Sequence, residues 1–132
     1  MKIKKSLGQN FLNNKDILNR IVECGDIQEK DIIIEIGPGT GNLTQKLLDK
    51  KPRKLIVVEK DTELSNFLKS KFNKKLEVIN EDILKYLSNF KFDNPVKVFG
   101  NLPYNISTKI LLSFLKLNNL ENYIKIYIYI SK

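Results

Sequence analysis

The chain has 132 residues, 42% of them hydrophobic, which is enough for one domain with a core and short for two. It contains no histidine and a single cysteine, which leaves no intrachain disulfide, no Cys/His zinc cluster and no histidine base. The net charge of +8 favours a polyanionic partner such as nucleic acid, although biased genome composition would give the same lysine excess. No membrane span or signal peptide is recognisable, so we expect the cytoplasm or an organelle matrix.

Apolar runs alternate with amphipathic helical patterns along the chain. Residues 1–14 predict a loop or short turn, and Asn14 is a suitable cap for the helix that follows. Ser107 or Thr108 is a suitable cap for the last helix. Helices are predicted at residues 16–25, 43–51, 63–72, 83–90 and 107–117, and strands at 31–36, 54–59, 76–80, 96–99 and 123–130.

This alternation predicts an α/β fold, with a parallel, doubly wound sheet and right-handed crossovers. We find no repeat and no domain linker. The fifth strand is rich in β-branched and aromatic residues and would form a long exposed edge if nothing followed it. We therefore expect the domain to be truncated after this strand.

Three glycines separate the first strand from the next helix, in the order Glu35-Ile36-Gly37-Pro38-Gly39-Thr40-Gly41. Glycines at this place let the backbone approach a ligand closely, and a plain turn would need only one. The spacing is G-x-G-x-G, whereas dinucleotide enzymes use G-x-G-x-x-G. A carboxylate at Glu35 would repel a diphosphate and suits a cationic or zwitterionic ligand, such as the methionine part of S-adenosylmethionine.

Acidic residues also follow the second and third strands. Glu59 is placed to accept hydrogen bonds from both hydroxyls of a ribose, and Asp82 from an adenine amino group. Each residue alone would more often be a helix cap or a solvated acid. Because the carboxyl ends of parallel strands share one edge of the sheet, the acids and the glycine loop together predict a nucleoside pocket.

The fourth strand leads into Asn101-Leu102-Pro103-Tyr104. Pro103 has a fixed φ and no N–H, so we expect the backbone to turn out of the sheet there. A rigid amide beside a flat ring is suited to hold a planar amine, such as the exocyclic amine of adenine. The plain alternative is a proline turn with Tyr104 as a core ring.

With these motifs, the chain resembles the ribosomal RNA adenine dimethyltransferases, the KsgA family, which is related to the Erm methylases. The resemblance covers essentially the whole chain in order and spacing. The segment Asn105-Ile106-Ser107-Thr108 is similar to the ribosomal RNA branch rather than to DNA methylases. The matching positions are Gln9-Asn10-Phe11-Leu12, residues 35–41, Glu59, Asp82 and residues 99–108.

The resemblance implies a Rossmann-like class I methyltransferase fold with S-adenosylmethionine as cofactor. It implies that Asn10 and Leu12 close over the methionine end, and that Gly37 contacts the cofactor through its backbone. Glu59 would hold the ribose and Asp82 the cofactor adenine.

The implied catalytic residues are Asn101, Leu102, Pro103 and Tyr104. Asn101 would meet both cofactor and target, and with the Leu102 carbonyl it would favour a pyramidal amine nitrogen. Tyr104 would stack on the flipped base, worth roughly 1–3 kcal/mol. The sulfonium methyl is then attacked in line, so no metal is needed and positioning supplies most of the rate.

The family members are about twice as long, so residues 1–132 correspond to the N-terminal part of the catalytic domain, without the C-terminal helical RNA-recognition domain. Ser131 stands where the family usually has Gln. We expect a monomer, with no membrane partner, that methylates small-subunit ribosomal RNA during ribosome biogenesis. The main alternative is a non-catalytic RNA-binding or ribosome-assembly remnant. A DNA adenine methylase and a nicotinamide oxidoreductase are less favoured.

Overall fold

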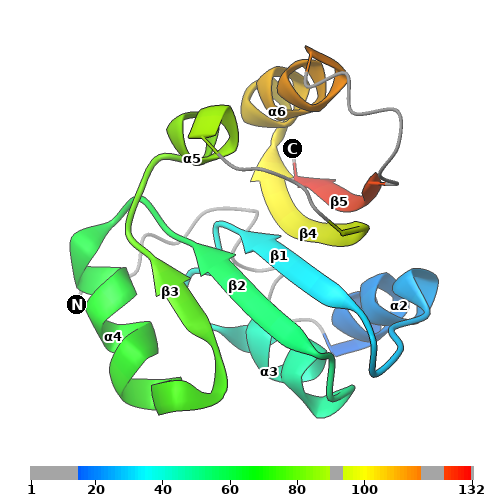
Figure 1. Cartoon of the computed structure of the whole chain (residues 1–132), viewed down its shortest axis with the longest axis vertical. Coiled ribbons are helices and arrows are strands. Elements are labelled where there is room, and N and C mark those ends of the chain that lie inside the picture. Colours follow the sequence, from blue (N-terminus) through cyan, green and yellow to red (C-terminus); the bar gives the residue numbers. More distant parts are fainter. Residues whose placement is uncertain (1–14, 90–93, 117–123, 132) are drawn as a thin grey trace.

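The computed structural model describes residues 15–89, 94–116 and 124–131. In this part of the chain, five parallel strands form one sheet in the order β3-β2-β1-β4-β5 (Figure 1). This arrangement confirms the predicted parallel, doubly wound α/β fold. The strands are β1 (Ile32–Ile36), β2 (Lys54–Val58), β3 (Glu77–Ile79), β4 (Val96–Pro103) and β5 (Ile124–Ser131).

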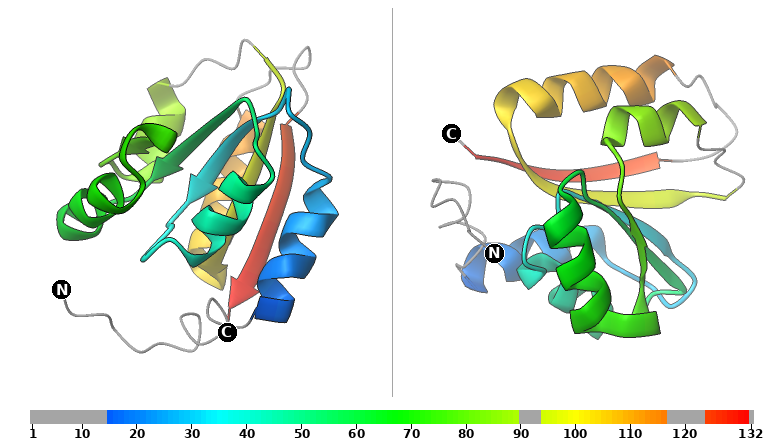
Figure 2. Two further views of the ribbon diagram at one scale, coloured as in Figure 1. Left: turned by 90° about the horizontal axis from the view of Figure 1, so that it is seen from below. Right: turned by 90° about the vertical axis from the view of Figure 1, so that its left-hand side faces the viewer.

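Helices cover both faces of the sheet (Figure 2). One face carries α2 (Lys15–Gly25), α3 (Asn42–Asp49) and α4 (Thr62–Phe72), the last followed by a 3₁₀ turn (Asn73–Lys75). The opposite face carries α5 (Ile83–Asn89) and α6 (Tyr104–Lys116). None of these helices, within the described ranges, has the length and apolar content of a membrane-spanning segment.

The central strands are buried on both faces, which explains their continuous apolar runs. Ile33 and Val57 pack into the layer of α2, α3 and α4, whereas Ile34 and Val58 pack into the layer of α5 and α6. Each of these two central strands therefore contributes to two cores, and Glu35 is the one charged residue inside β1.

The fourth strand is longer than predicted. β4 continues through Pro103, which lies opposite Ser131 of β5. The expectation that Pro103 turns the chain out of the sheet is wrong. Beyond Gly100, which is opposite the last residue of β1, β4 pairs in the described residues with β5 alone. A proline at this place removes a hydrogen-bond donor at the end of a strand and leaves the strand intact.

The last helix begins earlier than predicted, at Tyr104. The Ser107 hydroxyl donates to the Pro103 carbonyl at 3.0 Å, and the Thr108 hydroxyl donates to the Tyr104 carbonyl at 3.1 Å. Both are bonds to the residue four positions back, so Ser107 and Thr108 lie inside α6 and do not cap it. The predictions for residues 1–14, with the Asn14 cap, lie outside the described residues.

Candidate functional site: a cleft at the carboxyl edge of the sheet

A cleft of about 320 Å³ lies at the carboxyl ends of β1 and β2, between them and the first turns of α5 and α6. We call it the carboxyl-edge cleft. Open parallel sheets bind their ligands at this edge, and the volume is within the range of small-molecule sites. The lining residues are Ile36, Gly37, Val58, Glu59, Lys60, Glu81, Asp82, Ile83, Leu84, Leu102, Ile106 and Lys109.

The glycine loop forms one wall of this cleft through Gly37. Gly37 has φ +62°, and its N–H donates to the Val58 carbonyl at 3.0 Å, which joins the loop to the end of β2. At the far end of the loop, Gly41 has φ +92°, and a Cβ there would lie 2.6 Å from the ring of Phe72. Glycine is therefore required at both ends of the loop, by conformation and, at Gly41, by packing.

Glu59 follows β2 directly and is only 8% exposed. One carboxylate oxygen, Oε1, accepts the N–H of Gly39 at 3.3 Å, and the other, Oε2, accepts the N–H of Asp61 at 3.0 Å. Each oxygen of a carboxylate has a second acceptor site. The backbone thus orients Glu59 at the cleft while both oxygens keep capacity for a ligand hydroxyl.

Asp82 follows β3 and has two roles in the structure. Its Oδ1 accepts the N–H groups of Leu84 at 2.9 Å and Lys85 at 3.4 Å, so Asp82 caps α5. The helix-cap alternative therefore holds, and Asp82 also lines the carboxyl-edge cleft. A cap holds the carboxylate in one orientation, which a binding residue also needs.

The first two residues of the Asn-Leu-Pro-Tyr motif lie on opposite faces of the sheet, and the last two lie where β4 ends and α6 begins. Leu102 is 6% exposed and lines the cleft, in the layer of α5 and α6. By strand alternation, Asn101 lies on the other face with Phe99. Pro103 is exposed, and Tyr104 is 71% exposed, so Tyr104 is not a core ring. The structure brings Gly37, Glu59, Asp82 and Leu102 into one cleft, whereas Asn101, Pro103 and Tyr104 do not line it.

Other residues were predicted differently or missed. Asn10 and Leu12 lie outside the described residues. Glu35 does not line the carboxyl-edge cleft; it is buried in β1 beneath the glycine loop. Ile106 and Lys109 line the cleft and were missed, because the helix was predicted to begin after Ile106. Their i, i+3 spacing on one helical face was the available signal.

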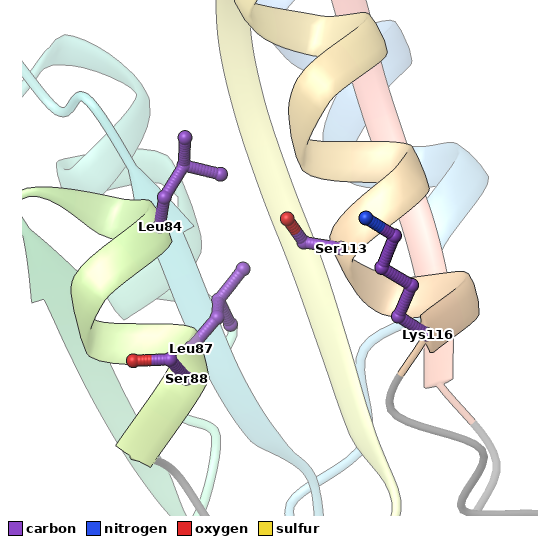
Figure 3. A pocket seen from close by; sticks show the side chains of 5 residues that line it. All are labelled: Leu84, Leu87, Ser88, Ser113 and Lys116. Carbon is purple, nitrogen blue, oxygen red and sulfur yellow. The ribbon is translucent and has the colours of Figure 1, made fainter.

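A second hollow, of about 230 Å³, lies between α5 and α6 (Figure 3). It is lined by Leu84, Leu87, Ser88, Ser113 and Lys116. The Ser88 hydroxyl donates to the Lys85 carbonyl at 2.7 Å, and the Ser113 hydroxyl to the Lys109 carbonyl at 3.0 Å. Both serines are bonded to their own helices, and Lys116 is the single charged side chain among the described residues of the lining. This hollow is a packing feature.

Comparison with known proteins decides the family. Residues 1–130 match the family model described as ribosomal RNA adenine dimethylase. The chain belongs to the ribosomal RNA adenine dimethylase family. A relative within this family, the ribosomal RNA small subunit methyltransferase A of Pelagibacter ubique (strain HTCC1062), is 55% identical over 111 residues. That match covers 84% of this chain and 42% of the relative, so the chain spans less than half the length of the curated relatives it matches.

Solved structures support the family and the fold. The 23S rRNA methyltransferase ErmE is similar with a TM-score of 0.71 and 30% identity, covering 83% of this chain and 44% of ErmE. A dimethyladenosine transferase from Plasmodium falciparum gives a TM-score of 0.68 and 31% identity, covering 81% of this chain and 38% of that chain. The chain therefore has the Rossmann-like methyltransferase fold that the sequence resemblance implied.

Proposed function

We propose that this chain is the S-adenosylmethionine-binding part of a ribosomal RNA adenine N6,N6-dimethyltransferase. Its reaction would transfer methyl groups to the exocyclic amine of adenines in small-subunit ribosomal RNA during ribosome biogenesis. The observation that carries the proposal is the carboxyl-edge cleft, where Gly37, Glu59 and Asp82 meet beside Leu102. Membership of the dimethylase family supports the substrate class.

The cleft suits the nucleoside part of this cofactor. Glu59 and Asp82 offer acceptor oxygens, which match the donor hydroxyls of a ribose and the donor amino group of an adenine. Apolar side chains, among them Ile36, Val58 and Leu102, provide flat contact area for the base. We assign Glu59 to the ribose, Asp82 to the adenine and Gly37 to a backbone contact. Asn10 and Leu12 are proposed to cover the methionine end.

When bound, the cofactor supplies an electrophilic methyl group on a sulfonium. The residues of the chain then act by positioning. Asn101 and the Leu102 carbonyl would accept the two hydrogens of the target amine, and Pro103 would stiffen the backbone between them and Tyr104. Tyr104 is exposed, so its ring is accessible for stacking on a flipped base. Holding both reactants in line lowers the barrier without a base of tuned pKa or a metal.

We also propose that the protein works as a monomer on the precursor of the small ribosomal subunit. The net charge of +8 is suited to an RNA partner. A location in the cytoplasm, or in an organelle matrix that contains ribosomes, follows from that partner.

Calorimetric titration of the chain with S-adenosylmethionine tests the proposal. We expect Glu59→Ala to weaken binding at least about tenfold, because charge-assisted hydrogen bonds to the ligand are lost. Glu29→Ala, at an exposed glutamate away from the cleft, is the matched control and should bind like the unmodified chain. Methyl transfer to small-subunit ribosomal RNA, detected as N6-methylated adenosine by nucleoside mass spectrometry, is the direct assay. RNA binding by a folded chain that binds no cofactor would instead support the non-catalytic assembly role.

A further inference from the structure

A carboxyl group is buried in the core directly below the glycine loop. Glu35 lies in β1 between Val57 of β2 and Phe99 of β4, and it is 1% exposed. Its side chain faces the apolar layer of α2, α3 and α4, where an unpaired charge would be costly. Glu35 therefore lies in the core and not at the surface of the cleft, where a ligand contact would be expected.

One hydrogen bond defines what Glu35 does in this layer. The Thr44 hydroxyl donates to Glu35 Oε1, and Thr44 is fully buried in the first turn of α3. Burial raises the pKa of Glu35 to about 8, and the nearby charge of Glu59 acts in the same direction, while the bond from Thr44 opposes them. At neutral pH the Glu35 carboxyl is thus held mainly as the neutral acid.

The bond joins the two sides of the loop. Glu35 lies two residues before Gly37, and Thr44 lies three residues after Gly41. The α3 helix has no side-chain cap at Gly41, so no cap fixes where the helix begins relative to β1. The Glu35–Thr44 bond fixes the start of α3 relative to β1 on the core side of the loop. On the cleft side, Glu59 accepts the N–H of Gly39.

We propose that Glu35 is a positioning residue that, through Thr44, holds the loop Gly37–Gly41 in the shape that binds the methyl donor. It acts as a neutral hydrogen-bond acceptor and not as the charged partner of the donor's cationic end. This inference rests on the proposed function and adds a residue to it. It also replaces the sequence-based interpretation in which the acid of Glu35 meets the ligand.

The test uses variants that separate charge from hydrogen bonding. Glu35→Gln removes the charge and keeps an acceptor oxygen for Thr44. Thr44→Val keeps the shape and removes the donor, whereas Thr44→Ser restores a hydroxyl. Thr62→Val, at an exposed threonine in the first turn of α4, is the matched control. Each variant is titrated with S-adenosylmethionine by calorimetry, and its unfolding temperature is measured without ligand.

We expect Glu35→Gln, Thr44→Ser and Thr62→Val to bind within about threefold of the unmodified chain. Thr44→Val should raise the Kd about tenfold, since the buried acceptor then lacks its donor. A merely structural role for Thr44 would lower the unfolding temperature and the binding stoichiometry while the Kd of the folded protein stays unchanged.

Two results would overturn the inference. One is a tenfold loss of affinity in Glu35→Gln, which would show that binding of the methyl donor needs the charge of Glu35. The other is an unchanged Kd in Thr44→Val. If Thr44→Val does not fold, Glu35→Gln and Thr44→Ser still test the inference, because it requires both variants to bind S-adenosylmethionine with nearly normal affinity. Absence of binding by the unmodified chain would contradict the proposed function and not this assignment.

Discussion

At the scale of single residues, two of the acids that line the carboxyl-edge cleft are oriented by backbone N–H groups. Glu59 accepts hydrogen bonds from Gly39 and Asp61, and Asp82 accepts them from the first turn of α5. A carboxylate with fixed geometry loses less freedom when a ligand binds, so a preformed network favours affinity. The sequence indicated which acids end the strands, but not the donors that orient them.

A partly buried ion pair, at the amino ends of β1 and β4, also uses charge for structure. Lys97 Nζ lies 2.7 Å from Asp31 Oδ2, with both side chains 14% exposed, and it also donates to the Asp26 carbonyl at 2.9 Å. Burial alone would raise the pKa of Asp31. The hydrogen bonds from Lys97 and the Gln28 N–H, with the charges of Lys97 and Lys30, instead hold this pKa below 3.8.

Lys97→Met should lower the free energy of unfolding by about 2 kcal/mol at neutral pH, because Asp31 then keeps its charge without its partner. A lowered pKa stabilises the folded state above the usual value of 3.8, and this contribution is lost as the pH falls through the lowered pKa. The difference between variant and unmodified chain should therefore shrink below about pH 4. Urea unfolding at several pH values measures this difference in the free energy of unfolding. Lys50→Met, at an exposed lysine, is the control. A difference that stays constant with pH would contradict the assignment.

At the scale of elements, close packing of α2 on the sheet depends on its last residue. A Cβ on Gly25 would overlap the ring of Phe99, which is fully buried and stacked on Tyr127 with ring centroids 5.0 Å apart. α2 therefore approaches β4 and β5 at a distance that only glycine allows. In the sequence, this glycine indicated only the end of a helix.

Gly25→Ala should destabilise the fold by about 1–2 kcal/mol, although alanine is the better helix former. The measurement is thermal or urea unfolding. Phe99→Leu in the same chain frees space for the new methyl group, so the double variant should be more stable than the sum of the two single effects predicts. Simple additivity would show that the contact between α2 and Phe99 is not the cause.

Two elements were misjudged for the same physical reason. The rule that proline ends a strand is local, whereas the length of β4 is set by its partner β5, which comes more than twenty residues later in the sequence. Once β4 extends to Pro103, α6 begins at Tyr104, and Ile106 and Lys109 then reach the cleft. Local propensity placed the other described elements within about two residues.

At the scale of the whole molecule, charge governs how the chain would meet RNA. The net charge of +8 is a long-range property that does not depend on the details of the fold. Counterion release makes such binding salt-dependent, with a slope set by the number of phosphates contacted.

Affinity for a small-subunit ribosomal RNA fragment should fall at least about tenfold between about 50 and 200 mM salt. Fluorescence anisotropy at several salt concentrations measures the slope. Binding of S-adenosylmethionine is the internal control and should change far less, because the cleft contacts are short and partly buried. RNA affinity that is insensitive to salt would argue against recognition through the phosphate backbone.

The sequence by itself determined the alternation of strands and helices, the glycine loop, the acids at the strand ends and the family. These features are local, since they depend on periodicity, on residue type and on spacing along the chain. Only the tertiary structure decided the strand order, the division of Asn101 and Leu102 between two faces, and the place of Glu35. The sequence alone does not distinguish a glutamate that contacts a ligand from one that is hydrogen-bonded to a threonine in the core. Its burial by distant segments sets its charge and its role.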